Sequence, residues 1–138
     1  MSFLGPLIAR GARRCVLVND RTGIAVAHDV EAALDSRSRR KGLLGRDGLQ
    51  HDQALVLAPC NAIHTFGMRF AIDAVFVAKD GRVMKIVEHL AAWRIAGSLR
   101  ALATVELPAG QARRAGLTEG DRLVVHRVAG ARIGAQPR

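Results

Sequence analysis

The chain has 138 residues, of which 49% are apolar and 24% are charged. This length excludes a multidomain enzyme and predicts one domain with a substantial buried core. The formal net charge is +9, but the basic residues are spread along the chain, and 18 of the 21 are Arg. A GC-rich genome produces that excess of Arg without selection for a polyanionic partner, so we predict no nucleic-acid partner. No apolar run reaches the ~18 residues that a membrane-spanning helix needs.

Two features of the sequence bear on the compartment. The apolar stretch 3–9 precedes its positive charges, Arg10, Arg13 and Arg14, which is the reverse of the order in a secretory signal. The two cysteines, Cys15 and Cys60, form neither a CxxC motif nor a zinc spacing. We therefore expect a soluble protein of the bacterial cytoplasm with reduced thiols and no disulfide.

The N-terminal third of the chain predicts a loose end, a hairpin and a helix. Residues 1–13 and 130–138 have no periodicity, so we expect flexible ends around a single folded domain at 14–129. Residues 15–18 and 24–27 predict two strands around a turn. Ser36 is the expected N-cap of a short basic helix, with Leu43 and Leu44 on its apolar side and Gly45 at its end.

The middle of the chain predicts a buried strand and a second hairpin. Residues 54–58 form a continuous apolar run before Pro59, and residues 72–88 predict two strands around Asp80 and Gly81. A two-residue turn would place Asp73 opposite Glu88, and like charges across a ladder are destabilising. We therefore predict a three-residue loop, 79–81, with Gly81 at positive φ. That loop pairs Asp73 with Val87 and Phe76 with Met84.

The C-terminal part predicts two more strands around a helical turn. Residues 102–107 form a strand that stops at Pro108, and residues 111–115 form a short helix with Gly116 and Leu117 in a Schellman end. Gly120 and Asp121 lie in a turn before a last strand at 122–128. The total of six or seven short strands and two helices predicts a mainly β fold, either a small antiparallel β-sandwich or a partly closed barrel.

Several segments together resemble a known family. They are 39–46 (RRKGLLGR), 63–73 (IHTFGMRFAID), 80–81 (DG), 106–110 (ELPAG) and 120–121 (GD). Their order is similar to that in the prokaryotic family catalogued as domain of unknown function 192, and the resemblance spans about residues 14–128. It implies a mostly β, sandwich-like fold, with no general activity or cofactor established. Many members carry an aromatic-Trp-Met-Lys-Asn-Thr sequence where this chain has residues 63–68, and many members are exported.

Asp73 is the first candidate site residue. Both faces of its predicted strand are apolar, so its carboxylate must be paired or hydrogen-bonded. The resemblance makes Arg39 and Arg46 the best donors, because both belong to the arginine motif of the family and a guanidinium can bind a carboxylate through two bonds. Backbone N–H groups are the alternative donors. The arrangement predicts a structural ion pair or an anion-binding or catalytic pocket, to which His64 and Met68 are added.

Cys60 and His64 form the second candidate, a Cys-x3-His pair. Such a pair can be a nucleophile with its base, or half of a metal site. On a strand, however, positions four apart lie ~13 Å from each other, so only an intervening turn would bring the two side chains together. The other histidines show no zinc spacing. We therefore predict no metal and no cofactor.

The sequence leaves three functional hypotheses. The first is a non-catalytic accessory module that binds a small ligand or a protein. The second is a small enzyme that uses Cys60, His64 and Asp73. The third is a basic protein associated with nucleic acid. A hydrogen bond between Cys60 and His64 in an open cleft favours the enzyme, whereas burial of the two apart excludes it.

Overall fold

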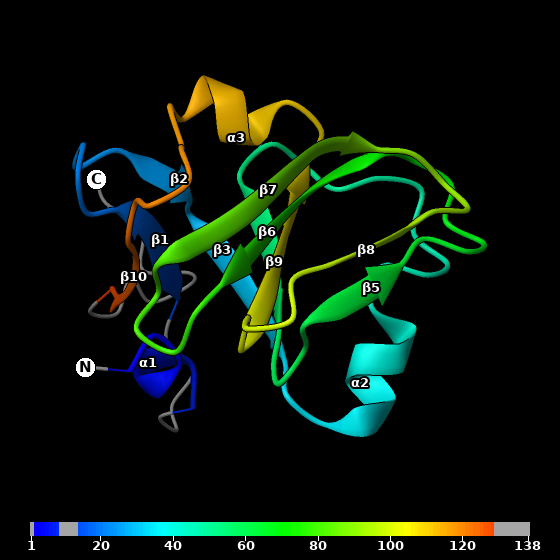
Figure 1. Ribbon diagram of the computed structural model, residues 1–138, viewed down its shortest axis with the longest axis horizontal. Coiled ribbons are helices and arrows are strands. Elements are labelled where there is room, and N and C mark those ends of the chain that lie inside the picture. The colour runs from blue at the N-terminus through cyan, green and yellow to red at the C-terminus, as the bar shows by residue number, and fades with distance from the viewer. Residues whose placement is uncertain (1, 9–13, 129–138) are drawn as a thin grey trace, which may run out of the picture.

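The computed structural model describes residues 2–8 and 14–128, and over them the protein is mainly β (Figure 1). The strands are β1 (Cys15–Asn19), β2 (Ala25–Ala27), β3 (Asp29–Ala33), β4 (Gln53–Leu57), β5 (Ala62–His64), β6 (Ile72–Val77), β7 (Val83–Leu90), β8 (Ile95–Gly97), β9 (Ala103–Pro108) and β10 (Leu123–Arg127). The helices are α1 (Gly5–Ile8), α2 (Ser36–Lys41) and α3 (Gln111–Arg114). None of these helices has the length and hydropathy that crossing a membrane requires.

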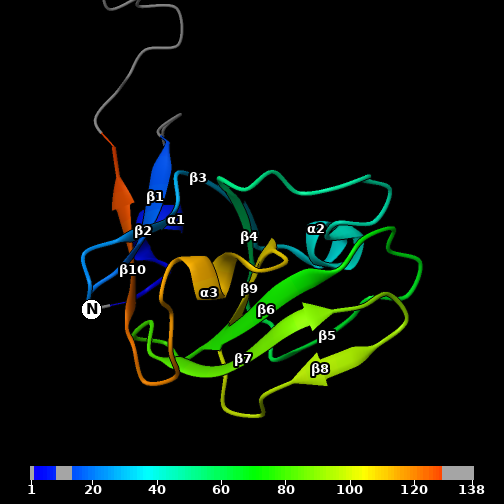
Figure 2. The same cartoon turned by 90° about the horizontal axis from the view of Figure 1, so that it is seen from above.

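A five-stranded sheet in the order β3-β4-β9-β6-β7 forms the centre of the fold. A three-stranded sheet, β10-β1-β2, lies on one side of it, and the two-stranded sheet β5-β8 lies on the other side together with α2 (Figures 1 and 2). The strands thus form stacked sheets rather than a closed barrel. The predicted mainly β fold is confirmed, and its one departure from the antiparallel arrangement that we predicted is the pair β3 and β4, which runs in parallel.

Alternation along the central strands produces two hydrophobic cores, one on each face of the five-stranded sheet. On β6, Val75 and Val77 point to the core shared with Leu17 and Leu123 of the three-stranded sheet. Their neighbour Phe76 points to the other core, where the residues that follow α2 and those of β5 pack. Because β4, β6 and β9 are covered on both faces, most of their residues are buried and apolar, and the buried polar exceptions are Asp73, Thr104 and Glu106.

The hairpin of β6 and β7 confirms the three-residue loop and corrects its register. The N–H of Ala78 donates to the carbonyl of Arg82, and Gly81 has a φ of +91°. The register then shifts between Phe76 and Val77, so that Phe76 pairs with Lys85 and not with Met84. The same shift places Val87 opposite Ala74, so the predicted pairing of Asp73 with Val87 is also wrong, and a second shift follows between Ile72 and Ala74. Two β-bulges thus move the ladder by one residue each, which charge repulsion alone could not predict.

The helix ends differ from the prediction at α2 and confirm it at α3. Asp35, not Ser36, is the N-cap of α2, and its carboxylate accepts the N–H of Ser38 at 2.7 Å. The helix ends at Gly42 rather than Gly45. At α3, the N–H of Leu117 donates to the carbonyl of Ala112 and that of Gly116 to Arg113, which is the predicted Schellman end.

Part of the N-terminal segment belongs to the fold. Within residues 1–13, which we predicted to be flexible, the structure describes residues 2–8. Phe3 is only 3% exposed there, and Leu4 and Leu7 pack on the same core. These apolar side chains therefore pack on the domain that we predicted to begin at residue 14. The remaining predicted flexible residues, 9–13 and 130–138, lie outside the described residues.

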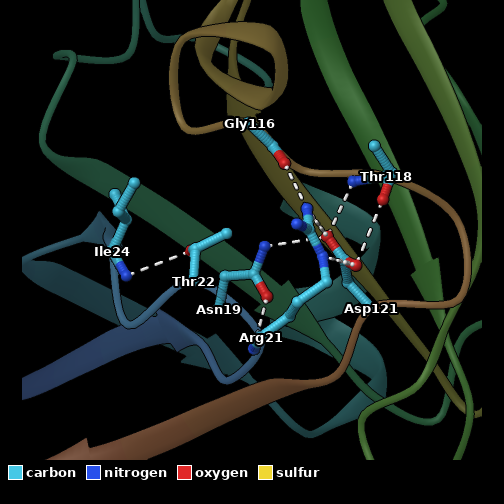
Figure 3. A network of polar contacts seen from close by, with 7 residues as sticks. All are labelled: Asn19, Arg21, Thr22, Ile24, Gly116, Thr118 and Asp121. Atoms are coloured by element: carbon cyan, nitrogen blue, oxygen red, sulfur yellow. Dashed lines mark hydrogen bonds and ion pairs between the residues drawn. The ribbon is translucent and has the colours of Figure 1, made fainter.

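Asp121 ties the turn after β1 to the turn before β10 (Figure 3). Its carboxylate accepts hydrogen bonds from the side chains of Asn19 at 2.8 Å and Arg21 at 2.6 Å, and from the N–H of Thr118 at 2.9 Å. The bond from Arg21 is the main reason that the pKa of Asp121 lies well below its usual range. The predicted turn glycines Gly116 and Gly120 flank this network at φ values of +66° and +93°.

Candidate functional site

A cavity of about 650 Å³ lies where α2 and β5 cover the second face of the central sheet. Its walls come from α2 and the residues just after it, from the segment between β4 and β5, and from one residue of β9. The side chains with polar or ionisable groups that line it are Ser36, Arg39, Arg40, Lys41, Cys60, Asn61, His64 and Glu106. The position follows from the topology, because α2 connects two neighbouring strands of the sheet and crosses beside this face.

Glu106 is the acidic residue of this cavity. On β9 it pairs with Leu55 of β4 and Ala74 of β6, whose side chains point to the second core. Glu106 shares that face and is only 4% exposed. Its Oε2 atom has no hydrogen-bond partner among the described residues. Burial raises the pKa of Glu106 to about 7, while the charge of Arg46 acts in the opposite direction.

Gly42 allows the end of α2 to approach this carboxyl. Its φ is +45°, and a Cβ built there would lie 3.6 Å from the carbonyl oxygen of Arg39 and 4.0 Å from Oε1 of Glu106. Glycine is the residue that adopts such backbone angles without a steric penalty. A side chain at Gly42 would therefore begin in van der Waals contact with the carboxyl of Glu106.

The two arginines of the predicted site have partners other than Asp73. The guanidinium of Arg39 donates to the carbonyls of Leu34 at 2.9 Å and Ala58 at 3.3 Å. Arg46 makes a two-bond ion pair with Glu31, with distances of 2.9 and 3.2 Å. Arg39 therefore fixes α2 to the ends of two strands, and Arg46 connects the segment after α2 to β3.

The predicted ion pair of Asp73 is wrong, and the alternative donors are correct. Asp73 is fully buried, and its carboxylate accepts hydrogen bonds from the N–H groups of His89, Gly110 and Ala112 at 2.9 to 3.1 Å. The pairing of Asp73 with Leu107 places it on the first face of the sheet, whereas α2 lies over the second. The sheet itself separates Asp73 from Arg39 and Arg46.

Cys60 and His64 both line the cavity, but their hydrogen bonds go to other groups. The thiol of Cys60 donates to the carbonyl of Ala62 at 3.2 Å, and Nδ1 of His64 accepts the N–H of Phe66 at 3.3 Å. The two residues are therefore neither a bonded dyad nor buried apart. Within residues 2–8 and 14–128, no group of three or more Asp, Glu, His or Cys side chains is arranged to hold a metal ion.

Four of the candidate residues thus line one cavity, namely Arg39, Cys60, His64 and Met68. Met68 is 8% exposed and also belongs to the second core. Arg46 reaches the site only through its charge on Glu106, and Asp73 lies across the sheet. From His64, the rings of Phe66 and Trp93 form a stack outward, with centroids 4.8 and 5.8 Å apart.

Sequence reasoning missed the role of Glu106, although a signal was present. Glu106 begins the 106–110 segment, and it is an acidic residue inside the largely apolar strand segment 102–107. The burial argument applied to Asp73 holds equally for that position. Which face of the sheet each carboxylate occupies, however, depends on strand pairings that the sequence does not show.

Comparison with known proteins places this architecture in a family. A solved structure from Sinorhizobium meliloti 1021, described as a candidate transcription regulator, has a TM-score of 0.70 and 26% identity, covering 84% of this chain and 95% of that one. A protein of unknown function from Novosphingobium aromaticivorans DSM 12444 has a TM-score of 0.69 and 23% identity, covering 80% and 82%. Among curated proteins there is no match. The model of the DUF192 family, described as uncharacterized ACR, matches residues 17–125, so the chain belongs to that family.

Proposed function

We propose that this protein is a non-catalytic binding module that holds a small polar ligand in the cavity at Glu106. The observation that carries the proposal is the Oε2 atom of Glu106, which is buried beside the cavity and has no partner among the described residues. Buried polar groups in folded proteins are nearly always hydrogen-bonded, and each exception calls for an explanation. A ligand that hydrogen-bonds to Glu106 explains this one.

The size of the cavity supports the same proposal. Its volume of about 650 Å³ lies within the range of ~300 to 1,000 Å³ that is usual for small-molecule sites. Its lining combines apolar side chains such as Leu43, Leu57 and Ile63 with a few polar groups. In ligand sites, the apolar part supplies most of the contact area and the polar groups fix the orientation.

The contacts of Cys60 and His64 favour binding over catalysis. A nucleophile needs its base within hydrogen-bond reach, and here Nδ1 of His64 is occupied by the N–H of Phe66. Asp73, the third residue of the enzyme hypothesis, faces the other core. The enzyme hypothesis is therefore weaker than the binding-module hypothesis.

Nucleic acid is the competing class of partner, because the Sinorhizobium meliloti neighbour is described as a candidate transcription regulator. We propose that this chain does not share such a role. Its two basic groups, Arg37–Lys41 on α2 and Arg113–Arg114 on α3, come from helices on opposite faces of the central sheet, with α3 at the top and α2 at the lower right of Figure 1. The single domain at 14–129 and the cytoplasmic compartment stay predictions from the sequence.

A thermal-shift screen against small metabolites tests the binding function, with three proteins run in parallel. They are the wild type, a Glu106→Leu variant, and a Glu88→Gln control, in which an acidic residue outside the cavity lining loses its charge. A ligand at 100 times its Kd stabilises a protein by about 2.7 kcal/mol. We expect at least one compound to stabilise the wild type and the control but not Glu106→Leu. If every stabilising compound also acts on Glu106→Leu, the cavity is not the binding site.

A further inference from the structure

We propose that the ligand of this cavity is a small organic anion, a carboxylate or a phosphate, and that Glu106 donates a hydrogen bond to it as a neutral carboxylic acid. This inference rests on the binding function proposed above and specifies its ligand class. In this arrangement Glu106, Arg40 and Lys41 contact the ligand.

The charges of the lining select an anion. Arg39, Arg40 and Lys41 bring three positive charges to the cavity, and Glu106 is the sole acidic side chain among the described lining residues. The guanidinium of Arg39 is held by carbonyl groups, but Arg40 makes only a 3.4 Å contact with the carbonyl of Ser36. No hydrogen bond or ion pair of the Lys41 ammonium is found within the described residues. Arg40 and Lys41 can therefore both turn to an anionic ligand.

The surroundings of Glu106 favour its neutral form. The residues paired with it on β4 and β6 are Leu55 and Ala74, which offer no hydrogen bonds from their side chains. Arg46 is the one cation coupled to Glu106, and both of its bonding nitrogens are engaged by Glu31 of β3. The remaining titratable groups of the cavity are Cys60, His64 and the cations of α2. The pKa of Glu106, raised to about 7 by burial, places the neutral acid within reach at neutral pH.

A protonated carboxyl and an anionic oxygen make a strong, charge-assisted hydrogen bond. The proton of Glu106 bridges its own oxygen and that of the ligand, and Arg40 and Lys41 balance the ligand charge. A cationic ligand would require the opposite arrangement, with an ionised Glu106 in an apolar setting and three cations beside the ammonium. The two ligand classes therefore differ in the sign of their pH dependence.

Calorimetric titration of the full chain separates the classes with four probes. Succinate and glycerol 3-phosphate represent the two kinds of anion, putrescine represents a cation, and erythritol represents a neutral polyol. We expect at least one anion to bind and the other two probes not to bind. For the binding anion, raising the pH from 7 to 8.5 should weaken affinity by up to about tenfold per unit, because the ionised fraction of Glu106 must take up a proton on binding and this fraction grows above the pKa. Titrations in buffers of different ionisation enthalpy count that proton directly.

Three variants identify the groups responsible. Glu106→Gln keeps an N–H donor but cannot titrate, so it should bind the same anion with an affinity that does not change over this pH range. Lys41→Ala should weaken anion binding several-fold. The matched control, Arg113→Ala, removes one positive charge from α3, outside the cavity lining, and should leave affinity unchanged.

The outcomes distinguish the ligand class from the binding function. Tight binding of putrescine or erythritol, or an anion affinity that increases with pH in the wild type, overturns the anion inference and leaves the binding module intact. Failure of both anions to bind at millimolar concentration also overturns it. If the metabolite screen in addition yields no compound that depends on Glu106, the proposed binding function is wrong as well.

Discussion

Two buried acidic residues on adjacent central strands show how one residue type serves two purposes. The carboxylate of Asp73 accepts hydrogen bonds from three backbone N–H groups, whereas Oε2 of Glu106 has no hydrogen-bond partner among the described residues. The first arrangement stabilises a loop, since it ties β7 and the start of α3 to β6. The second costs stability, and such costs are typical of positions kept for binding.

Replacing Asp73 should destabilise the protein strongly. In Asp73→Ala, the N–H groups of His89, Gly110 and Ala112 lose their acceptor, and each buried unsatisfied donor costs about 1 to 3 kcal/mol. We expect a total loss of roughly 3 kcal/mol or more in urea unfolding. Asp73→Asn keeps one acceptor oxygen and should lose less. The control is Asp29→Ala, an exposed position on β3 where the change should be within about 0.5 kcal/mol. An Asp73→Ala variant as stable as this control would contradict the assigned role.

Glu106 should make the protein less stable as the pH rises. Folding raises the pKa of Glu106 from 4.5 to about 7. Its contribution to the free energy of unfolding is therefore complete at a pH below the pKa of the unfolded chain, and it is lost as the pH increases through 7. Between pH 5 and 8 the loss amounts to about 2 to 3 kcal/mol. Glu106→Gln removes this titration, so its advantage over the wild type in urea unfolding should grow by that amount across the range. Parallel curves for the two proteins would show that Glu106 is solvated.

At the scale of elements, local sequence signals predicted most of the strands and turns, but they did not predict which distant strands pair with one another. The β6–β7 loop, the Schellman end of α3 and the strands with continuous apolar runs follow from nearby residues such as Gly81 and Gly116. Strands β3, β5 and β8 were not predicted. β5 and β8 have only three residues each, β3 has two acidic residues and no apolar run, and all three pair with partners that are distant in the sequence. The candidate site could be predicted only in part for the same reason. Arg39, His64 and Met68 could be chosen from the sequence, but their meeting with Glu106 depends on sheet order.

The β6–β7 loop offers a test that separates backbone strain from steric conflict. Gly81 and Gly120 have nearly equal φ values, +91° and +93°. A Cβ at Gly81 would collide with the carbonyl oxygen of Leu123, whereas at Gly120 it would meet open space. We expect Gly120→Ala to cost about 1 to 2 kcal/mol from backbone strain alone. Gly81→Ala should cost clearly more in chemical unfolding, because the 2.8 Å bond from the Leu123 N–H to the Gly81 carbonyl is also displaced. Equal losses would mean that the loop moves away from β10 without cost.

At the scale of the whole molecule, the arrangement of the sheets and helices determines where the positive charge lies. A net charge of +9 attracts polyanions in general, but recognition of nucleic acid requires the charges to form one continuous surface. Here three basic residues of α2 line the cavity, namely Arg39, Arg40 and Lys41. The arginines of α3 belong to a helix at the top of Figure 1, whereas α2 lies at the lower right. Arg21, Arg46, Arg69 and Arg113 are moreover each paired with an acidic side chain.

These features predict weak, nonspecific contact with nucleic acid. We expect a labelled duplex and a labelled single strand to bind only at low ionic strength, without sequence preference, and to be released by about 0.15 M salt, since a few scattered phosphate contacts are readily displaced by counterions. In a plot of the logarithm of the binding constant against the logarithm of the salt concentration, each neutralised phosphate contributes ~0.9 to the negative slope. Because few phosphates are contacted, we expect a shallow slope. Arg40→Ala and Arg113→Ala should each lower that slope slightly and to the same degree, because neither helix is a dedicated contact. Submicromolar binding that survives 0.15 M salt, and that Arg40→Ala abolishes while Arg113→Ala does not, would instead make α2 a nucleic-acid surface.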